Sequence, residues 1–290
     1  MRKFVRIISA VVVLLFFSFC NLPKPDHTVT VMTFNIRFDN PGDGINAWSN
    51  RIPVTKAYMS QETPDILGVQ ESLYHQNLDL LEIMPGYAYV GTGRDDGKEG
   101  GEFSPIFYRK EVFELLEDAQ FWLSETPDVP GSIGWEAILP RVVTWAKLKH
   151  VQSGKELFVF NTHYSHVSDL ARRKSMEFMA DKINEIAGDH PVIVLGDFNI
   201  TQGSDLYHHM VAHLEEKNGL QNAEYLSQQP VSLADATFNA FRDGIEPRVI
   251  DYIFVDNNFD VLSYAVDIVK EDEVFISDHW PVKAVLKLKP

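Results

Sequence analysis

Apolar residues run through this sequence in short blocks that predict buried β-strands. Most of these blocks are apolar at consecutive positions, which is typical of strands that are covered on both faces. The blocks span residues 28–37, 65–71, 104–109, 142–148, 156–164, 191–199 and 249–256. An eighth block, 281–289, alternates apolar residues with lysines. This alternation predicts either a strand at a sheet edge or a strand with one half-exposed face.

Helices are predicted between these strands. The clearest runs from Ser168 to Ala187, because Ser168 can cap its start and Gly188 can end it. Met179, Ile183 and Ile186 lie at helical spacing within this segment. Further helices are predicted at 48–62, 72–83 and 205–216. Strands and helices that alternate over one long domain predict an α/β fold.

The first 20 residues read as an export signal. Three basic residues precede an apolar run from Ile7 to Phe17, which is too short to span a membrane. Cys20, the single cysteine of the chain, ends this segment and can be lipidated after cleavage, although residues 17–19 match a lipobox poorly. Residues 21–27 contain two prolines and predict a tether. We therefore expect a signal at 1–20, a tether at 21–27 and one domain at 28–290. The protein would be periplasmic, anchored to the outer membrane through Cys20, or extracellular, and monomeric.

The chain is acidic, with 26 Lys and Arg against 41 Asp and Glu and a net charge of −15. No run of basic residues follows the signal. An acidic protein repels long polyanions unless it presents a basic patch or a bound metal ion. The charge therefore argues against non-specific DNA binding. It does not exclude a small phosphate ester as the substrate.

Six of the apolar segments run directly into acids, amides or histidines. Asp and Asn favour turns, so one such ending would be ordinary. Six together predict that the strand ends gather a single site. The residues at these ends are Asn35, Gln70, Glu71, Asn161, Thr162, His163, Asp197, Asn199, Asp251, Ser277, Asp278 and His279.

Carboxylate and amide oxygens without a thiolate favour a hard divalent cation such as Mg²⁺ or Mn²⁺. Mg²⁺ pairs with phosphate oxygens, and histidines beside carboxylates can bind phosphate, move protons or stabilise developing charge. The polar strand ends therefore predict a metal site that acts on phosphate.

The motifs TFNIR, GVQE, FYR, NTH, GDFN, IDYIF and SDH occur in this order over nearly all of the chain after the tether. In this ordered set the sequence resembles the endonuclease/exonuclease/phosphatase superfamily, which includes pancreatic deoxyribonuclease, and its style is similar to that of secreted bacterial members. The resemblance implies a four-layer α/β/β/α sandwich of two mixed sheets, with the site at one edge.

The resemblance also implies the metal ligands. Glu71 of GVQE would bind the catalytic cation directly. Asn35 and Asp278 would complete the set of metal-binding residues, and Asn35 would also contact the phosphate. Asp197 and Asn199 of GDFN would position and deprotonate the attacking water or support a second metal ion.

The remaining implied roles concern the phosphate. His279 of SDH would touch it, with Asp251 of IDY on the far ring nitrogen, and His279 acts either as a base or as a charge stabiliser. His163 and Asn161 of NTH would bind phosphate oxygens. Tyr108 of FYR is either catalytic or a buried tyrosine. Arg141 either contacts phosphate or is structural.

The predicted reaction is hydrolysis of a phosphodiester or phosphomonoester by in-line attack of water, without a covalent enzyme intermediate. The substrate could be a small molecule, a lipid head group or a nucleic acid, and its selection is assigned to the loops 94–103 and 123–140. Two alternatives stay open. One is a scavenging nuclease that acts on DNA or RNA. The other is a non-catalytic surface lipoprotein that binds a ligand.

Overall fold

The computed structural model describes residues 27–229 and 234–289. The predicted signal at 1–20, with Cys20, and residues 21–26 of the tether lie outside the described residues. Within the described part, no helix has the length and apolar character needed to cross a bilayer. The elements are β1 Thr28–Asn35, η1 Pro41–Asn46, α1 Trp48–Glu62, β2 Ile66–Gln70, α2 Tyr74–Ile83, β3 Tyr87–Val90, β4 Ile106–Arg109, β5 Phe113–Trp122, β6 Val142–His150, β7 Glu156–His163, α3 Asp169–Ala187, β8 Val192–Asp197, α4 Asp205–Asn218, β9 Gln221–Asn222, α5 Ala223–Leu226, β10 Asp251–Val255, β11 Phe259–Val266, β12 Lys270–Glu271, β13 Val274–Phe275 and β14 Val282–Leu288.

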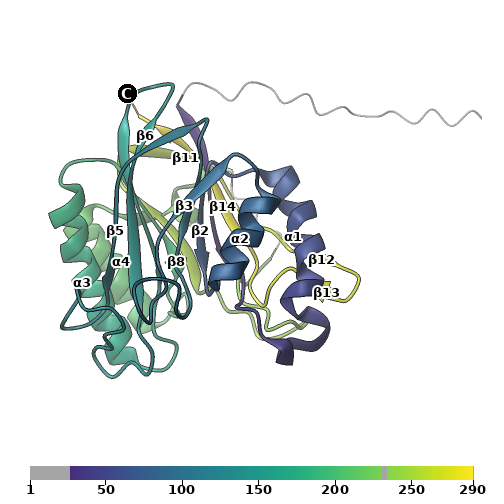
Figure 1. The fold of residues 1–290 in the computed structure, drawn as a ribbon. Helices are drawn as coiled ribbons and strands as arrows, with labels where there is room; N and C mark the ends of the chain where they lie inside the picture. The colour runs from purple at the N-terminus through teal and green to yellow at the C-terminus, as the bar shows by residue number, and fades with distance from the viewer. Residues whose placement is uncertain (1–26, 230–233, 290) are drawn as a thin grey trace, which may run out of the picture.

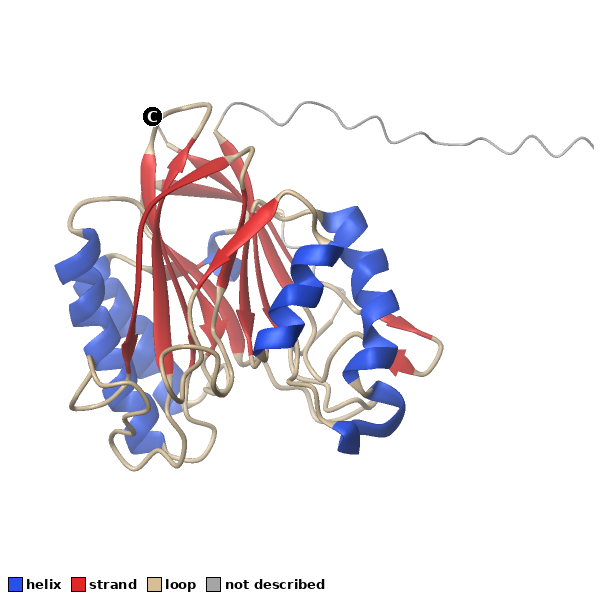
Figure 2. Cartoon of the chain, viewed as in Figure 1, coloured by secondary structure: helices blue, strands red, loops and turns tan. Residues whose placement is uncertain are grey.

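Two mixed six-stranded sheets form the centre of the molecule. The first has the strand order β11-β14-β1-β2-β4-β3, and the second has the order β5-β6-β7-β8-β10-β9. Helices α1 and α2 cover the outside of the first sheet, and α3 and α4 cover the outside of the second (Figures 1 and 2). The predicted four-layer α/β/β/α sandwich of two mixed sheets is therefore confirmed.

Burial on both faces explains the consecutive apolar residues of strand β8. Ile193 and Leu195 belong to the core cluster that includes residues of both sheets. Val192 and Val194 belong to a second cluster, which includes residues of α3 and α4. Successive strand residues point to opposite faces, so a strand between two buried layers must be apolar at every position.

The predicted helices form, and α3 carries the expected caps. The Ser168 side chain accepts a hydrogen bond from the backbone N–H of Ala171, and Gly188 ends α3 with a φ of 55°. Helix α4 begins in the same way at Ser204 and ends at Gly219 in the left-handed conformation. Such caps satisfy backbone groups that a helix end leaves open.

All eight predicted strands are present, but strand β14 is not at an edge, because it lies between β11 and β1. Its alternation reflects the second expectation, a half-exposed face. Strands β3, β5 and β11 and the two-residue strands β9, β12 and β13 were not predicted from the hydrophobic pattern.

The strand directions bring the motifs to one edge of the sandwich. Strand β1 is parallel to β2, with Asn35 opposite Gln70. Strand β7 is parallel to β8, with His163 opposite Asp197. Strand β10 is antiparallel to β8, and its first residue, Asp251, pairs with Asp197. The ends of β1, β2, β7 and β8 and the start of β10 therefore meet.

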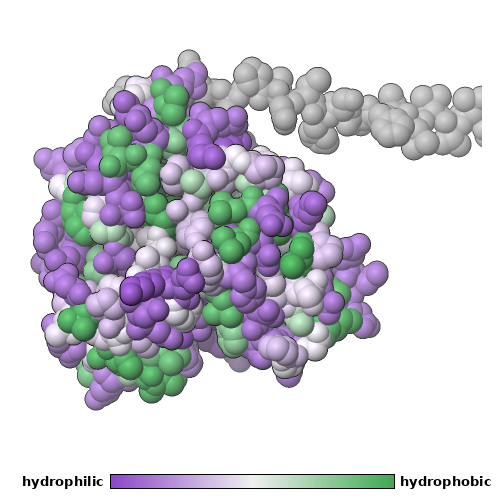
Figure 3. All heavy atoms as spheres, in the orientation of Figure 1, coloured by the Kyte–Doolittle hydropathy of each residue, from purple (hydrophilic) through white to green (hydrophobic). Residues whose placement is uncertain are grey.

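The surface drawn in Figure 3 is mostly hydrophilic, with hydrophobic residues scattered over it and a small group at its lower left. The loop between β5 and β6 carries several exposed apolar side chains, and Figure 1 shows this loop on the same side of the molecule. The side chains of Val129, Ile133 and Ile138 are more than half exposed. This loop is one of the two to which substrate selection was assigned.

Candidate active site

A cavity of about 590 Å³ opens where the strand ends meet. It contains most of the residues that the sequence analysis assigned to one site. Those that line it are Glu71, Arg141, His163, Asp197, Asn199, Asp278 and His279. Asn35 and Asp251 lie directly behind them, through contacts to Asp197 and His279. The convergence of these distant segments is the geometry that the sequence required.

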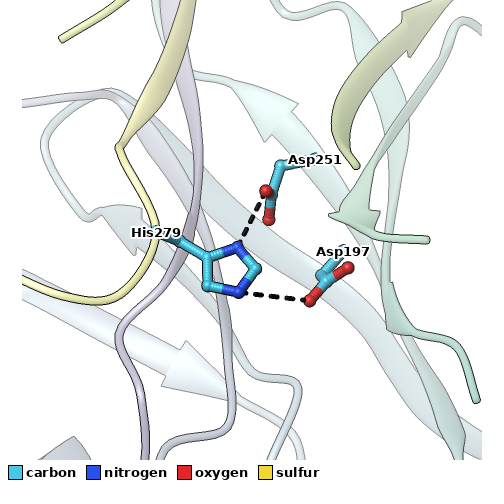
Figure 4. A group of neighbouring side chains, drawn as sticks. All are labelled: Asp197, Asp251 and His279. Atoms are coloured by element: carbon cyan, nitrogen blue, oxygen red, sulfur yellow. Dashed lines mark hydrogen bonds and ion pairs between the residues drawn. The ribbon is translucent and has the colours of Figure 1, made fainter. Parts of the chain in front are cut away.

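His279 lies between two buried aspartates (Figure 4). Its Nδ1 is 2.9 Å from Oδ2 of Asp251, and its Nε2 is 3.8 Å from Oδ2 of Asp197. Burial alone would lower the pKa of His279, but the charges of Asp251, Asp197 and Asp278 raise it to about 10. The ring is therefore an imidazolium at neutral pH, oriented by Asp251 and directed at the cavity.

Asp197 is held by two donors at the end of β8. The backbone N–H of Asn199 donates to its Oδ1 at 2.9 Å, and Nδ2 of Asn35 donates to its Oδ2 at 3.0 Å. Burial and the charge of Asp251 raise the pKa of Asp197 to about 7. A carboxylate with a pKa near neutrality is suited to accept a proton during the reaction.

Glu71 and Asp278 form the acidic side of the cavity. Nδ2 of Asn35 also donates to Oε1 of Glu71 at 3.1 Å, so a single amide aligns Glu71 and Asp197. Arg37 lies 3.8 Å from Glu71 and 3.9 Å from Asp278. Burial and the charge of Glu71 raise the pKa of Asp278. The metal and phosphate roles of Asn35 stay predictions, and its side chain lies behind Glu71 and Asp197.

The acidic side fits a hard divalent cation, because it offers several carboxylates and no sulfur ligand. Ligand atoms of Asp197, Asp251 and His279 also lie within 4.8 Å of one another. However, Nδ1 of His279 is bonded to Asp251, and a protonated imidazole cannot ligate a cation. Glu71 and Asp278, beside Asp197, are therefore the better place for a metal ion.

Three residues of the cavity adopt positive φ angles, which are uncommon outside glycine. These are Arg37 at 57°, Glu71 at 64° and Asn199 at 50°. Each follows the end of a strand and turns the chain sharply there. Sparsely populated backbone conformations of this kind concentrate at functional sites.

A second side of the cavity centres on Glu102, which the sequence analysis did not identify. Its Oε2 bonds Nη1 of Arg94 and lies 3.7 Å from Nη1 of Arg141 and 3.9 Å from Nδ1 of His163. Burial, together with the charges of Arg141 and Arg94, holds the pKa of His163 well below its usual value. Nε2 of the neutral ring lies 3.5 Å from Asp197.

Other lining residues were missed as well, namely Arg37, Phe38, His166 and Phe238. Arg37 stands in the TFNIR motif, directly after the strand, which was a usable signal. Glu102 lies in the glycine-rich loop 94–103, whose sequence carries no periodicity that would place it. The spacing of this loop from the other motifs gave no signal for Glu102.

The structure does not support the substrate-binding role predicted for Asn161. Its Nδ2 donates to the backbone carbonyls of Val69 and Pro105 at 2.7 and 2.8 Å, and its Oδ1 accepts from Gln70 at 2.7 Å. The side chain is fully buried and joins β7 of the second sheet to β2 of the first. Its hydrogen-bonding groups are used within the protein.

The structure does not support the catalytic role predicted for Tyr108 either. Tyr108 pairs with Ile66, at the opposite end of β2 from Gln70, and it does not line the cavity. It is 8% exposed, as expected for the alternative of a buried tyrosine.

Comparison with proteins of known structure gives close matches over nearly the whole fold. An endonuclease/exonuclease/phosphatase from Bacteroides vulgatus is 39% identical, with a TM-score of 0.85 over 90% of this chain and 99% of that one. A protein of the same family from Bacteroides thetaiotaomicron is 38% identical, with a TM-score of 0.84 over 91% and 98%. A mannosyl-6-phosphatase from Bacteroides thetaiotaomicron is 37% identical, with a TM-score of 0.81 over 89% and 99%.

A curated relative is more distant. An uncharacterized protein of Acanthamoeba polyphaga mimivirus is 22% identical over 226 residues, covering 65% of this chain. The match spans 33% of the length of that relative. The model of the Endonuclease/Exonuclease/phosphatase family matches residues 32–279, which include every strand end described above. The chain therefore belongs to the endonuclease/exonuclease/phosphatase family, a family of phosphoester hydrolases.

Proposed function

We propose that this protein is an exported, Mg²⁺- or Mn²⁺-dependent phosphoesterase that hydrolyses small phosphomonoesters by in-line attack of water. The observation that carries the proposal is the position of the charged His279 beside Asp197 and the acidic pair Glu71 and Asp278. The groups proposed as proton acceptor, positively charged donor and metal ligands thus line one cavity.

Glu71 and Asp278 would hold the cation, with Asn35 aligning Glu71 against Asp197. A bound divalent cation supplies positive charge that neutralises the phosphate oxygens. Asp197, fixed by the N–H of Asn199, accepts a proton from the attacking water.

His279 would stabilise charge on the phosphate rather than act as the base, because its raised pKa keeps the ring protonated at neutral pH. Asp251 keeps the ring in this state and orientation. His163 and Arg141 line the same cavity and would contact further phosphate oxygens.

The preference for a monoester rests on the similarity to the mannosyl-6-phosphatase, which is 37% identical. The acidic chain also argues against a nuclease, because it would repel a long polyanion. Export through residues 1–20, attachment through a lipidated Cys20 and a monomeric state belong to this proposal.

A panel of substrates tests it. Purified protein would be assayed with p-nitrophenyl phosphate, bis-p-nitrophenyl phosphate, sphingomyelin and a DNA zymogram, each with Mg²⁺ and with EDTA. We expect hydrolysis of the monoester that EDTA abolishes, and a loss on the order of 10²-fold in His279→Gln. Clearing of DNA without monoester hydrolysis would instead support a nuclease. Binding of phosphate esters without turnover would support a non-catalytic binding protein.

A further inference from the structure

The glycine-rich loop 94–103 contributes a buried carboxylate that the proposed reaction does not use. Glu102 lines the cavity, and the imidazole of His163 separates it from Asp197. Glu102 therefore does not contact the proposed proton acceptor, and it lines the same cavity.

The contacts of Glu102 leave one of its oxygens for a ligand. Its Oε2 takes the bond from Arg94 and the approaches of Arg141 and His163. Among the described residues, none of these contacts involves Oε1. The side chain is 16% exposed and lines the cavity, so a hydrogen-bond acceptor is available there.

Arg141 supplies a donor beside this acceptor. Its side chain is 6% exposed, and its Nη1 has no hydrogen-bond partner within the described residues. An unsatisfied buried donor is costly, and its presence in a cavity points to a ligand that satisfies it.

His166 adds a second donor at the mouth of the cavity. Its Nδ1 is 3.1 Å from Nη2 of Arg141. A guanidinium can only donate, so Nδ1 of His166 accepts and the neutral ring carries its proton on Nε2. Burial and the charge of Arg141 lower the pKa of His166, which favours this neutral form. Nε2 of the exposed ring is therefore an N–H donor.

We propose that Glu102, Arg141 and His166 bind hydroxyl groups of the leaving alcohol and select phosphomonoesters of polyhydroxylated, uncharged alcohols such as sugars. The inference rests on the proposed phosphomonoesterase function. A hydroxyl both donates and accepts, so neighbouring hydroxyls match an acceptor that alternates with N–H donors. A second anionic group on the leaving alcohol would be repelled by the carboxylate of Glu102. An apolar alcohol would leave buried polar atoms of the cavity unpaired.

The test compares two esters that differ in their hydroxyl groups. A hexose 6-phosphate carries them, and cyclohexylmethyl phosphate has a six-membered ring of similar size without them. We expect the wild type to prefer the hexose ester by at least about 10-fold in kcat/KM. Glu102→Gln should lose about 10-fold or more on the hexose ester and distinctly less on the cyclohexyl ester.

Two further variants keep the test decisive. Glu99→Gln changes an exposed glutamate of the same loop and serves as the matched control. His166→Phe removes the second donor. Because His166 is exposed, this variant should fold and can replace Glu102→Gln in the test if that variant does not fold. Thermal unfolding midpoints establish that each variant is folded. We expect His166→Phe to lose selectivity in the same direction as Glu102→Gln, and Glu99→Gln to keep the wild-type ratio.

Several results would overturn the inference. Equal losses on both esters in Glu102→Gln would mean that Glu102 only positions His163 for the phosphate step. A wild-type preference for the cyclohexyl ester would assign leaving-group selection to apolar residues. In both cases the phosphomonoesterase function would stand. Hydrolysis of neither ester with Mg²⁺ would refute the proposed function and this subsite with it.

Discussion

Two buried amides at strand ends have opposite roles in this molecule. Asn161 ends an apolar run in β7, and Asn35 ends one in β1, and both side chains are fully buried. Asn161 bonds the neutral carbonyls of Val69 and Pro105 and the amide of Gln70. Asn35 instead shares its amide nitrogen between the carboxylates of Glu71 and Asp197.

The two networks differ in the charge of the groups to which each amide is bonded. Around Asn161 the polar groups are neutral, and both ends of its own amide are bonded within the protein, so the network stabilises the joint between the sheets. Around Asn35 two carboxylates share one neutral donor beside a cavity, and the cationic groups Arg37 and His279 lie 3.8 Å from Glu71 and Asp197, respectively. Carboxylates that face a cavity indicate a ligand site, and burial of an amide alone does not.

The largest expected effect comes from Glu71→Gln, which removes charge from the cluster around Asn35. Turnover should fall on the order of 10²-fold or more, because a preorganised charged group is lost. Stability should stay the same or rise slightly, because repulsion with Asp278 is relieved. Steady-state kinetics and urea unfolding measure the two effects. Glu82→Gln, at an exposed position, is the control. Unchanged turnover in Glu71→Gln would refute its assigned role.

Asn161→Leu should show the opposite pattern. The change removes one hydrogen bond from each of two carbonyls and from the amide of Gln70, and we expect a loss of about 3 kcal/mol in the free energy of unfolding. Activity per folded molecule should change by less than about 3-fold, because Asn161 does not reach the cavity. Urea titration, with kinetics well below the unfolding midpoint, tests both. A fall in kcat/KM near that of Glu71→Gln would restore the phosphate contact predicted from the sequence.

Metal binding distinguishes the network around Asn35 from the network around Asn161 without an activity assay. Mg²⁺ at ten times its Kd should stabilise the wild type by about 1.4 kcal/mol, because it binds the folded state alone. This shift should disappear in Glu71→Gln and remain in Asn161→Leu. Thermal unfolding with Mg²⁺ and with EDTA measures it. Equal shifts in wild type and Glu71→Gln would place the metal ion elsewhere.

Much of the fold could be predicted because hydrophobic pattern and burial are directly linked. The continuous apolar run of β8 and the capped helix α3 are examples. Strand β11 was missed because a bulge between Val261 and Ser263 shifts its register and breaks the alternation. Strand β5 was missed because it lies at a sheet edge with exposed acidic residues along its length.

The site was predictable where a polar residue ends a strand that points to the catalytic edge. The same pattern gave no information on hydrogen-bond partners, so Asn161 was assigned like Asn35. It gave no strand direction either: β4 is antiparallel to β2, so the end of β4 with Tyr108 lies at the far edge. Glu102 and His166 depend on loop conformations that residue types alone did not define.

The smallest effect is expected from Tyr108→Phe, which changes a residue at the sheet edge opposite the cavity. Its hydroxyl makes no side-chain hydrogen bond among those found in the described residues, so its removal should change the free energy of unfolding by less than about 0.5 kcal/mol. Turnover should be unchanged. Tyr58→Phe is the matched comparison, because the hydroxyl of Tyr58 donates to Asp267 at 2.8 Å. Its loss should cost about 1–2 kcal/mol, as for a buried hydrogen bond to a charged group. A tenfold fall in kcat for Tyr108→Phe, with stability intact, would show that a residue outside the cavity takes part in the reaction and would break the link between strand direction and function.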